Sequence, residues 1–278
     1  LRCPLGLGGN GQYFIHNSNV TSETPSPFNF IDGAYLEITN STFSMGSGNL
    51  TITLYQGSEA KISESRFLRP VFTEHYGAVF LAQQNLFSSS VYIDINSNKQ
   101  NIQDEVVIQG NHFGTILKVE GVSWNATVVN NVFSGRAEGF STTTIEGVKK
   151  EMIPHWAATA IFSGVCNAHL SLASNDFSKC GGTLYIDMPQ RISLKKFCPQ
   201  LASSTTGLWD PYSSNAPNLA KNRFRASRSS GKNNKPSLPS VVLSTVYSPF
   251  EANWHAYAFK LNMQRNWWGD SSGPWLCC

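Results

Sequence analysis

The sequence repeats a short pattern, an Asn followed two residues later by an aromatic residue, over most of its length. The clearest copy ends a β-branched run in VVNNVFSG, residues 128–135. The copies are Asn85–Phe87, Asn111–Phe113, Asn131–Phe133, Asn175–Phe177, Asn222–Phe224 and Asn266–Trp268, with Ser41–Phe43 and Ser65–Phe67 as weaker versions. Because internal repetition decides the architecture of a chain, this pattern constrains the fold more than any other feature does.

The spacing of the aromatic residues indicates a regular coil. The intervals are 24, 46, 20, 44, 47 and 44 residues for the series Phe43, Phe67, Phe113, Phe133, Phe177, Phe224 and Trp268. If the short intervals are one coil and the long ones two, the series spans about ten coils of roughly 22 residues. Such a coil is too short for a βαβ unit, which needs about 30 residues.

Short alternating runs, such as Leu50–Leu54, Val106–Ile108 and Leu184–Ile186, are bounded by Gly, Asn and Ser. Period-2 alternation between such residues predicts strands. Strands stacked about 4.8 Å apart, coil upon coil, make a parallel β-helix. We therefore predict an all-β, single-stranded parallel β-helix, right-handed because parallel crossovers almost always are.

The recurring Asn suits the corner between two strands. There the backbone can adopt the left-handed conformation, which Asn tolerates better than other non-glycine residues. Its amide both donates and accepts, so Asn side chains in successive coils can form a hydrogen-bonded ladder. Two residues later the ring is expected to point inward and stack on its counterpart in the next coil.

The chain is expected to be one domain, with residues 1–33 as an N-terminal cap and 34–278 as the solenoid. Three segments break the pattern and are predicted loops: 136–156, 199–218 and 225–240. The last loop and the residues before it collect six basic side chains, Lys221, Arg223, Arg225, Arg228, Lys232 and Lys235. This loop could bind an anionic glycan or an acidic protein, and a solvated loop is the alternative.

Composition and sequons favour an extracellular protein. Only 14% of residues are charged and the net charge is +3, too small to argue for a nucleic-acid partner. No apolar run approaches the roughly 18 residues of a membrane span. Glycosylation sequons begin at Asn19, Asn40, Asn49 and Asn125. Asn40 should face solvent because it precedes the inward Ser41, and with six cysteines the sequons predict secretion.

The cysteines fall into two groups. Two of Cys166, Cys180 and Cys198 could be bonded, since they lie within two expected coils. Cys3 and the pair Cys277–Cys278 lie at opposite ends of the chain, whereas disulfide Cα atoms must lie within about 7 Å. These terminal cysteines could pair with polypeptide outside this chain, join copies end to end, stay free, or bond locally as Cys277–Cys278.

Motifs for catalysis are weak. GDSSGP at residues 269–274 differs from the serine-protease motif by an inserted Ser, and no base accompanies it. Polysaccharide lyases and hydrolases share the predicted fold, but they need converging carboxylates. The expected neighbours, Glu37 with Glu59 and Asp187 with Asp210, form no richer cluster. The six histidines lack metal-ligand spacing. We therefore predict no enzyme activity, metal or cofactor.

Glycan binding without turnover is a third class of function. Candidate stacking residues are Trp209, Tyr212, Trp254, Tyr257 and Trp275, although such rings also pack against a solenoid or its cap. A groove lined by three or more carboxylates would favour an enzyme, and a row of exposed aromatic rings a lectin-like role.

The stretch NWWGDSSGP, residues 266–274, resembles the NWWG-x-x-x-GP element that closes many right-handed parallel β-helix repeat arrays of pectate-lyase-like fold. Among animal proteins the chain is similar to the β-helix regions of Bark beetle (Anakonda)-type adhesive proteins. This resemblance implies an extracellular structural or adhesive role. The expected partners are other protein chains, either copies of this one or flanking modules, together with N-linked glycans.

Overall fold

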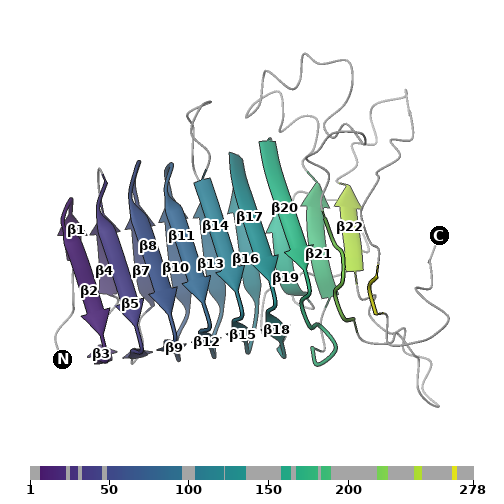
Figure 1. Ribbon diagram of the computed structural model, residues 1–278, viewed down its shortest axis with the longest axis horizontal. Coiled ribbons are helices and arrows are strands. Elements are labelled where there is room, and N and C mark those ends of the chain that lie inside the picture. The colour runs from purple at the N-terminus through teal and green to yellow at the C-terminus, as the bar shows by residue number, and fades with distance from the viewer. Residues whose placement is uncertain are drawn as a thin grey trace, which may run out of the picture.

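The structure is a computed structural model that describes residues 7–22, 26–30, 33–45, 49–95, 104–121, 123–135, 158–163, 167–180, 183–188, 218–224, 241–245 and 265–267. These residues form 22 strands and no helix. The strands stack side by side into one column that runs from the N-terminal to the C-terminal part of the chain (Figure 1). The predicted all-β parallel solenoid is confirmed.

Three parallel sheets form the sides of the column. Sheet A contains β1 (Leu7–Gly9), β4 (Ser26–Phe30), β7 (Leu50–Leu54), β10 (Val71–His75), β13 (Val91–Ile95), β16 (Leu117–Gly121), β19 (Ala158–Ser163), β21 (Thr183–Met188) and β22 (Val241–Thr245). Sheet B contains β2 (Gln12–His16), β5 (Tyr35–Thr39), β8 (Glu59–Ser63), β11 (Val79–Gln83), β14 (Asp104–Gln109), β17 (Ser123–Val129) and β20 (Asn167–Ala173). Sheet C contains β3 (Asn19–Ser22), β6 (Thr42–Met45), β9 (Arg66–Phe67), β12 (Leu86–Phe87), β15 (His112–Phe113) and β18 (Val132–Phe133).

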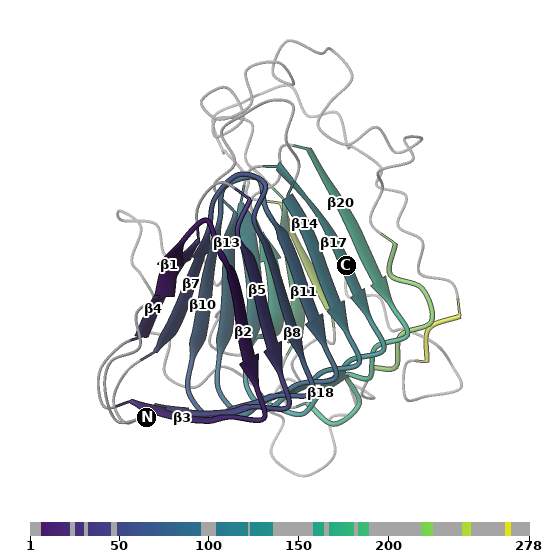
Figure 2. The ribbon, with the colours of Figure 1, turned by 60° about the vertical axis from the view of Figure 1, so that its left-hand side comes forward.

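From β1 to β20, each coil gives one strand to sheets A, B and C in turn, so each strand pairs with the strand three places along the chain; sheet A then continues from β19 to β21 and β22. Figure 2 shows the three sheets as the sides of a roughly triangular column. The pairs are in register: Val71, for example, lies between Leu50 and Val91. In-register pairing places equivalent residues of successive coils directly above one another.

The 46-residue interval from Phe67 to Phe113 is two coils, as predicted, because Phe87 stacks between the two rings. The three long intervals after Phe133 are single coils, not pairs of coils as the sequence predicted. Asn131 and Asn175 are 44 residues apart, yet their side chains bond directly at 3.0 Å. Bridges continue from Asp176 to Arg223 and from Arg223 to Trp267. Six ring-to-ring steps lead from Phe43 to Phe224, and the bridge from Arg223 to Trp267 adds a seventh, so the ten coils expected over this span are corrected to seven. Strand stacking fixes the height of a coil and leaves its chain length free, so extra residues do not add a coil.

The predicted loops 136–156 and 225–240, and residues 199–217 of the third, lie outside the described residues. The first strands begin earlier than expected. Strands β1 to β4 lie inside the segment 1–33 that was predicted as a cap, and they pair in parallel with the following coil. The stacked coils therefore start at Leu7, well before Ala34.

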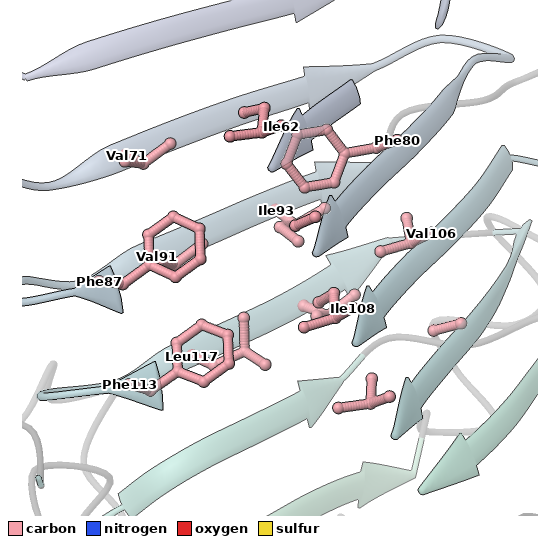
Figure 3. Close-up of a cluster of buried hydrophobic side chains, with 14 of the residues drawn as sticks. Ile62, Val71, Phe80, Phe87, Val91, Ile93, Val106, Ile108, Phe113 and Leu117 are labelled. Atoms are coloured by element: carbon pink, nitrogen blue, oxygen red, sulfur yellow. The ribbon is translucent and has the colours of Figure 1, made fainter. Parts of the chain in front are cut away.

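The core is built by alternation of inward and outward residues along the strands. In β5 and β8 every second residue is buried, as in Leu36 and Ile38 of β5. Figure 3 shows side chains from neighbouring coils, including Phe87 and Phe113, repeated one above another inside the column. The buried rings stack with centroids 4.5 to 5.3 Å apart through Phe43, Phe67, Phe87, Phe113, Phe133, Phe177 and Phe224. Trp268, the expected last ring, lies outside the described residues.

Two neighbours in β9 test this packing. Phe67→Ala should lower the free energy of unfolding by about 3–5 kcal/mol, because it opens a cavity between two stacked rings. Arg66→Ala is the matched control, since Arg66 points outward and is exposed, and should change stability by less than about 0.5–1 kcal/mol. Urea denaturation of both variants measures the difference. Equal losses would contradict the inward ring stack.

Candidate functional site

The asparagine ladder lines one corner of the column, just before sheet C. The Oδ1 atom of Asn131 accepts hydrogen bonds from the backbone N–H of Asn111 at 2.8 Å and from its Nδ2 at 3.1 Å. The Nδ2 atom of Asn131 donates to Asn175 Oδ1 at 3.0 Å and to the carbonyl of Ile108 at 2.9 Å. The same exchange links Asn85, Asn111, Asn131, Asn175 and Asn222, and Asn222 N–H donates to Asn266 Oδ1 at 2.7 Å.

The left-handed backbone conformation lies one residue earlier than the sequence predicted. Among the described residues, every non-glycine residue with positive φ lies just before a ladder position or its Ser equivalent: Asn17, Asn40, Glu64, Gln84, Asn130, Ser174, Lys221 and Arg265. Gly110 has a positive φ at the same place before Asn111. The expectation that the ladder Asn itself takes this conformation was wrong. The exposed residue makes the turn, and the buried Asn is needed for an amide that donates and accepts.

The sequon asparagines differ in exposure. Asn19 and Asn40 are exposed, Asn49 and Asn125 are half-buried, and Ser41 is buried. The prediction that Asn40 faces solvent is confirmed. Its Nδ2 donates to Asn17 Oδ1 at 2.7 Å. Asn19 and Thr42 are paired neighbours in sheet C, so the first two sequons lie close together on adjacent coils.

Several predicted site residues lie outside the described residues. Cys180 is described and buried, and its thiol donates to the carbonyl of Phe177 at 2.9 Å. Lys221 and Arg223 of the basic loop are exposed. The rest are outside: Cys3, Cys166, Cys198, Cys277 and Cys278 of the cysteines, Arg225, Arg228, Lys232 and Lys235 of the basic loop, and the candidate stacking residues Trp209, Tyr212, Trp254, Tyr257 and Trp275.

Three carboxylates form a row on the outer face of sheet A. Asp94 is in register with Glu74 in one neighbouring strand and with Glu120 in the other. Because in-register strands lie about 4.8 Å apart, the three side chains are adjacent. The acidic row is not evident in the sequence, because its residues are 20 and 26 positions apart and follow no constant interval.

Neighbouring side chains partly offset the negative charge of the acidic row. Glu120 pairs with Lys118 at 2.6 Å, and Thr53 donates to Glu74 at 3.5 Å. Burial raises the pKa of the Tyr76 phenol, and the charge of Glu74 raises it further. Among the described residues, no group of three or more His, Cys, Asp or Glu side chains could hold a metal ion.

Glu37 and Glu59, one of the two carboxylate pairs expected from the sequence, are not opposite each other in the strand register. Glu37 lies opposite Lys61, and Glu59 lies opposite Tyr35 and Val79. Asp187 lies opposite Ser163 and Ser244, and Asp210 is outside the described residues. Both expectations assumed one constant coil length, which the structure does not have.

A second polar group, the Glu37 cluster, lies on the outer face of the first three strands of sheet B. It consists of His16, Tyr35, Glu37, Thr39 and Lys61. Glu37 accepts a hydrogen bond from Tyr35 at 2.7 Å and from Thr39 at 3.4 Å, and its Oε1 lies 3.2 Å from His16 Nε2. Glu37 and Lys61 are in register.

The electrostatics of the cluster keep Glu37 ionised. The hydrogen bond from Tyr35 holds the pKa of Glu37 below its usual value, and Lys61 and His16 act in the same direction, against burial. The same bond, together with burial, raises the pKa of Tyr35 to about 12. The result is a carboxylate acceptor held in place by donors on three sides.

Phe14 adjoins this cluster on β2. Its side chain is 56% exposed, although it is a large apolar ring. Its ring centroid lies 5.8 Å from that of His16 and 5.9 Å from that of Tyr35, with interplanar angles of 80° and 53°. The alternation in QYFIH at residues 12–16 could have revealed an outward Phe14, but the segment was assigned to a cap.

Two titratable residues are buried at the corner between β10 and β11. Asp104 Oδ1 accepts hydrogen bonds from the N–H groups of Gly77 at 2.8 Å and Ala78 at 2.7 Å. Burial raises the pKa of Asp104, and these two bonds oppose the shift. His75 Nε2 lies 3.0 Å from Thr73 Oγ1, and burial lowers the pKa of His75 to about 3. Both side chains are buried and contact groups inside the column.

The raised pKa of Asp104 gives a pH-dependent prediction. The unfolded state releases this proton at a lower pH than the folded state, so the contribution of Asp104 to stability falls as pH rises through the folded pKa. Asp104→Asn removes this term. The stability of the variant relative to wild type should therefore be higher at pH 7 than at pH 3, measured by urea denaturation at both. A difference that is independent of pH would contradict the assignment.

Among the described residues, no helix is long and apolar enough to cross a membrane. No family model, curated protein or solved structure matches this chain.

Proposed function

We propose that this chain is a secreted or cell-surface, glycosylated solenoid with a structural or adhesive role and no catalytic activity. Its partners would be other protein chains, either copies of itself or flanking modules of a larger protein. The observation that carries the proposal is the continuous double ladder of buried Asn amides and Phe rings.

The ladders favour a rigid column. The asparagine ladder passes from Asn131 to Asn175 and on to Asn222 although 44 and 47 residues separate them. Fully satisfied buried polar networks specify one arrangement, because each broken bond would leave a buried group unpaired. A rigid column holds its outer faces in fixed register, which suits a spacer or an assembly surface.

Two further observations support the extracellular part of the proposal. Exposed sequon asparagines, Asn19 and Asn40, lie on the first two coils. The resemblance of NWWGDSSGP, residues 266–274, to the element that closes many right-handed parallel β-helix arrays of secreted and surface proteins supports the same location. Together with the Asn-x-aromatic coils, it makes the chain similar to Bark beetle (Anakonda)-type β-helix regions, which favours adhesion. Only residues 266–267 of this stretch belong to the described residues.

A bead-aggregation assay tests the adhesive role. The full chain is secreted from a eukaryotic host, coupled to fluorescent beads, and mixed with beads that carry it or an unrelated β-solenoid. We expect the chain-coated beads to aggregate with one another and not with the control beads. Mass measurement before and after glycosidase treatment reports glycosylation at Asn19 and Asn40. Chain-coated beads that stay dispersed would overturn self-assembly, and secretion without glycans would overturn the glycoprotein assignment.

A polysaccharide lyase or hydrolase is the second candidate, because the acidic row provides three adjacent carboxylates. Hydrolysis needs two carboxyl groups about 5–9.5 Å apart. The test incubates the chain with plant, fungal and bacterial polysaccharides and measures new reducing ends and unsaturated products. Activity lost in Asp94→Asn and retained in Glu105→Gln, a change at an exposed carboxylate of β14, would place an active site at the acidic row and overturn the non-catalytic proposal.

A further inference from the structure

We infer that the outer face of sheet B at its first three strands binds a neutral oligosaccharide, with Phe14 as the stacking surface and the Glu37 cluster as its hydrogen-bonding partner. Strands β2, β5 and β8 lie side by side there (Figure 2). This inference does not depend on assembly with other protein chains.

The register places the groups in one patch. Phe14, Glu37 and Lys61 occupy one row across the three strands. His16, Thr39 and Ser63 form the next row, two residues further along each strand. Since neighbouring strands are about 4.8 Å apart, each row spans about 10 Å, the scale of a di- or trisaccharide.

Phe14 differs from two pairs of outward aromatic rings elsewhere on the column. Phe72 stacks flat on Tyr92, and Tyr55 on Tyr76, with interplanar angles of 9° and 11°. Those rings cover one another's faces. Phe14 meets His16 at 80° and Tyr35 at 53°, so neither neighbour lies flat against it. An exposed ring without a flat neighbour can stack on the apolar C–H face of a sugar.

The polar groups beside the ring match the hydroxyl groups of a sugar. The ionised Glu37 only accepts hydrogen bonds, Lys61 only donates, and the hydroxyls of Thr39 and Ser63 do both. Thr39 Oγ1 and Ser63 Oγ lie 3.4 Å apart. The two hydroxyls form a short polar strip in the row next to that of Phe14. The three groups that bond Glu37 fix its orientation before a ligand arrives, which reduces the ordering cost of binding.

Charge favours a neutral ligand. Glu37 and Glu59 carry negative charge on this patch, so both would repel an anionic polysaccharide. Lys61 lies in register with Glu37 and offsets its charge, so a cationic ligand gains little. A ligand with many hydroxyl groups and no charge avoids both penalties.

Titration calorimetry with the full chain tests this inference, using hexasaccharides of β-1,4-glucose, β-1,3-glucose, mannose and N-acetylglucosamine as probes. Wild type should bind at least one of them, and Phe14→Ala should weaken that affinity at least about tenfold. Glu37→Gln should weaken it as well. Tyr55→Ala is the matched control, because Tyr55 is exposed but stacked on Tyr76, and its affinity should stay within about twofold of wild type.

Three results would overturn the inference. One is that no neutral hexasaccharide binds at millimolar concentration. Another is that Phe14→Ala and Tyr55→Ala bind equally well. The third is that oligogalacturonate or heparin fragments bind more tightly than every neutral probe. Thermal unfolding of each variant checks that the fold is kept. The bead assay with Phe14→Ala separates this site from self-assembly. If the saccharide inference is wrong, aggregation of the wild-type beads is unaffected, so the two proposals can fail independently.

Discussion

Asn131→Leu is expected to lower the free energy of unfolding by about 5 kcal/mol or more, the sum of several buried groups left unpaired at about 1–3 kcal/mol each. The substitution removes the acceptor of the backbone N–H and the Nδ2 of Asn111. It also removes the donor to the carbonyl of Ile108. All of these atoms are inside the column and have no water to replace the lost partner.

Asn130→Gly is the control for this prediction. Asn130 adjoins Asn131, is exposed and has a φ of 57°, which Gly adopts without strain. The control should change stability by less than about 1 kcal/mol. Asn131→Asp adds a second comparison, because it keeps an acceptor but loses the amide donor. Urea denaturation measures all three variants, and an Asn131→Leu loss no larger than that of Asn130→Gly would show that the ladder does not stabilise the column.

Acidification from pH 7.5 to pH 3 is expected to cost the protein about 4–5 kcal/mol through His75 alone, at 1.36 kcal/mol per pKa unit. Burial lowers the folded pKa of His75 from 6.5 to about 3. The unfolded chain therefore binds this proton at a higher pH than the folded chain does. Stability from His75 is fully present above pH 6.5 and is lost as pH falls from there to about 3.

The cause is the position of His75 within β10. It faces inward between Leu54 and Ile95 of the neighbouring strands, and its ring lies 5.4 Å from Phe80. His75→Leu removes the titrating group, so the variant should lose about 4–5 kcal/mol less than wild type over the same pH interval. His112→Leu, on an exposed residue, keeps His75 and should therefore keep the loss due to it. Parallel pH profiles for wild type and His75→Leu would contradict the prediction.

Features that depend on local pattern were predictable. The Asn-x-aromatic signal identified the stacking positions through Phe224, because in-register coils place the same residue types above one another. Alternation identified the inward residues of β7 and β20, since side chains in a strand point to opposite faces in turn. Asn40 was correctly placed outside because it precedes the buried Ser41.

Features that depend on coil length were not predictable. A coil of 44 residues and two coils of 22 give the same interval in the sequence, and only the direct bond from Asn131 to Asn175 separates them. The acidic row escaped notice for the same reason, since its members come from coils of unequal length. The Glu37 cluster escaped notice because residues 12–16 were expected to belong to a cap. Their alignment depends on strand register, which is set by backbone pairing between strands that lie far apart in the sequence.

The sequence alone determined that this chain winds as a β-solenoid with Asn and Phe on its inside. Repeated Asn amides can hydrogen-bond to one another, and repeated Phe rings can pack on one another, only when successive coils stack. The tertiary structure decided how many coils there are and which outward side chains meet. Those depend on where the backbone hydrogen bonds between coils form, and no interval in the sequence specifies that.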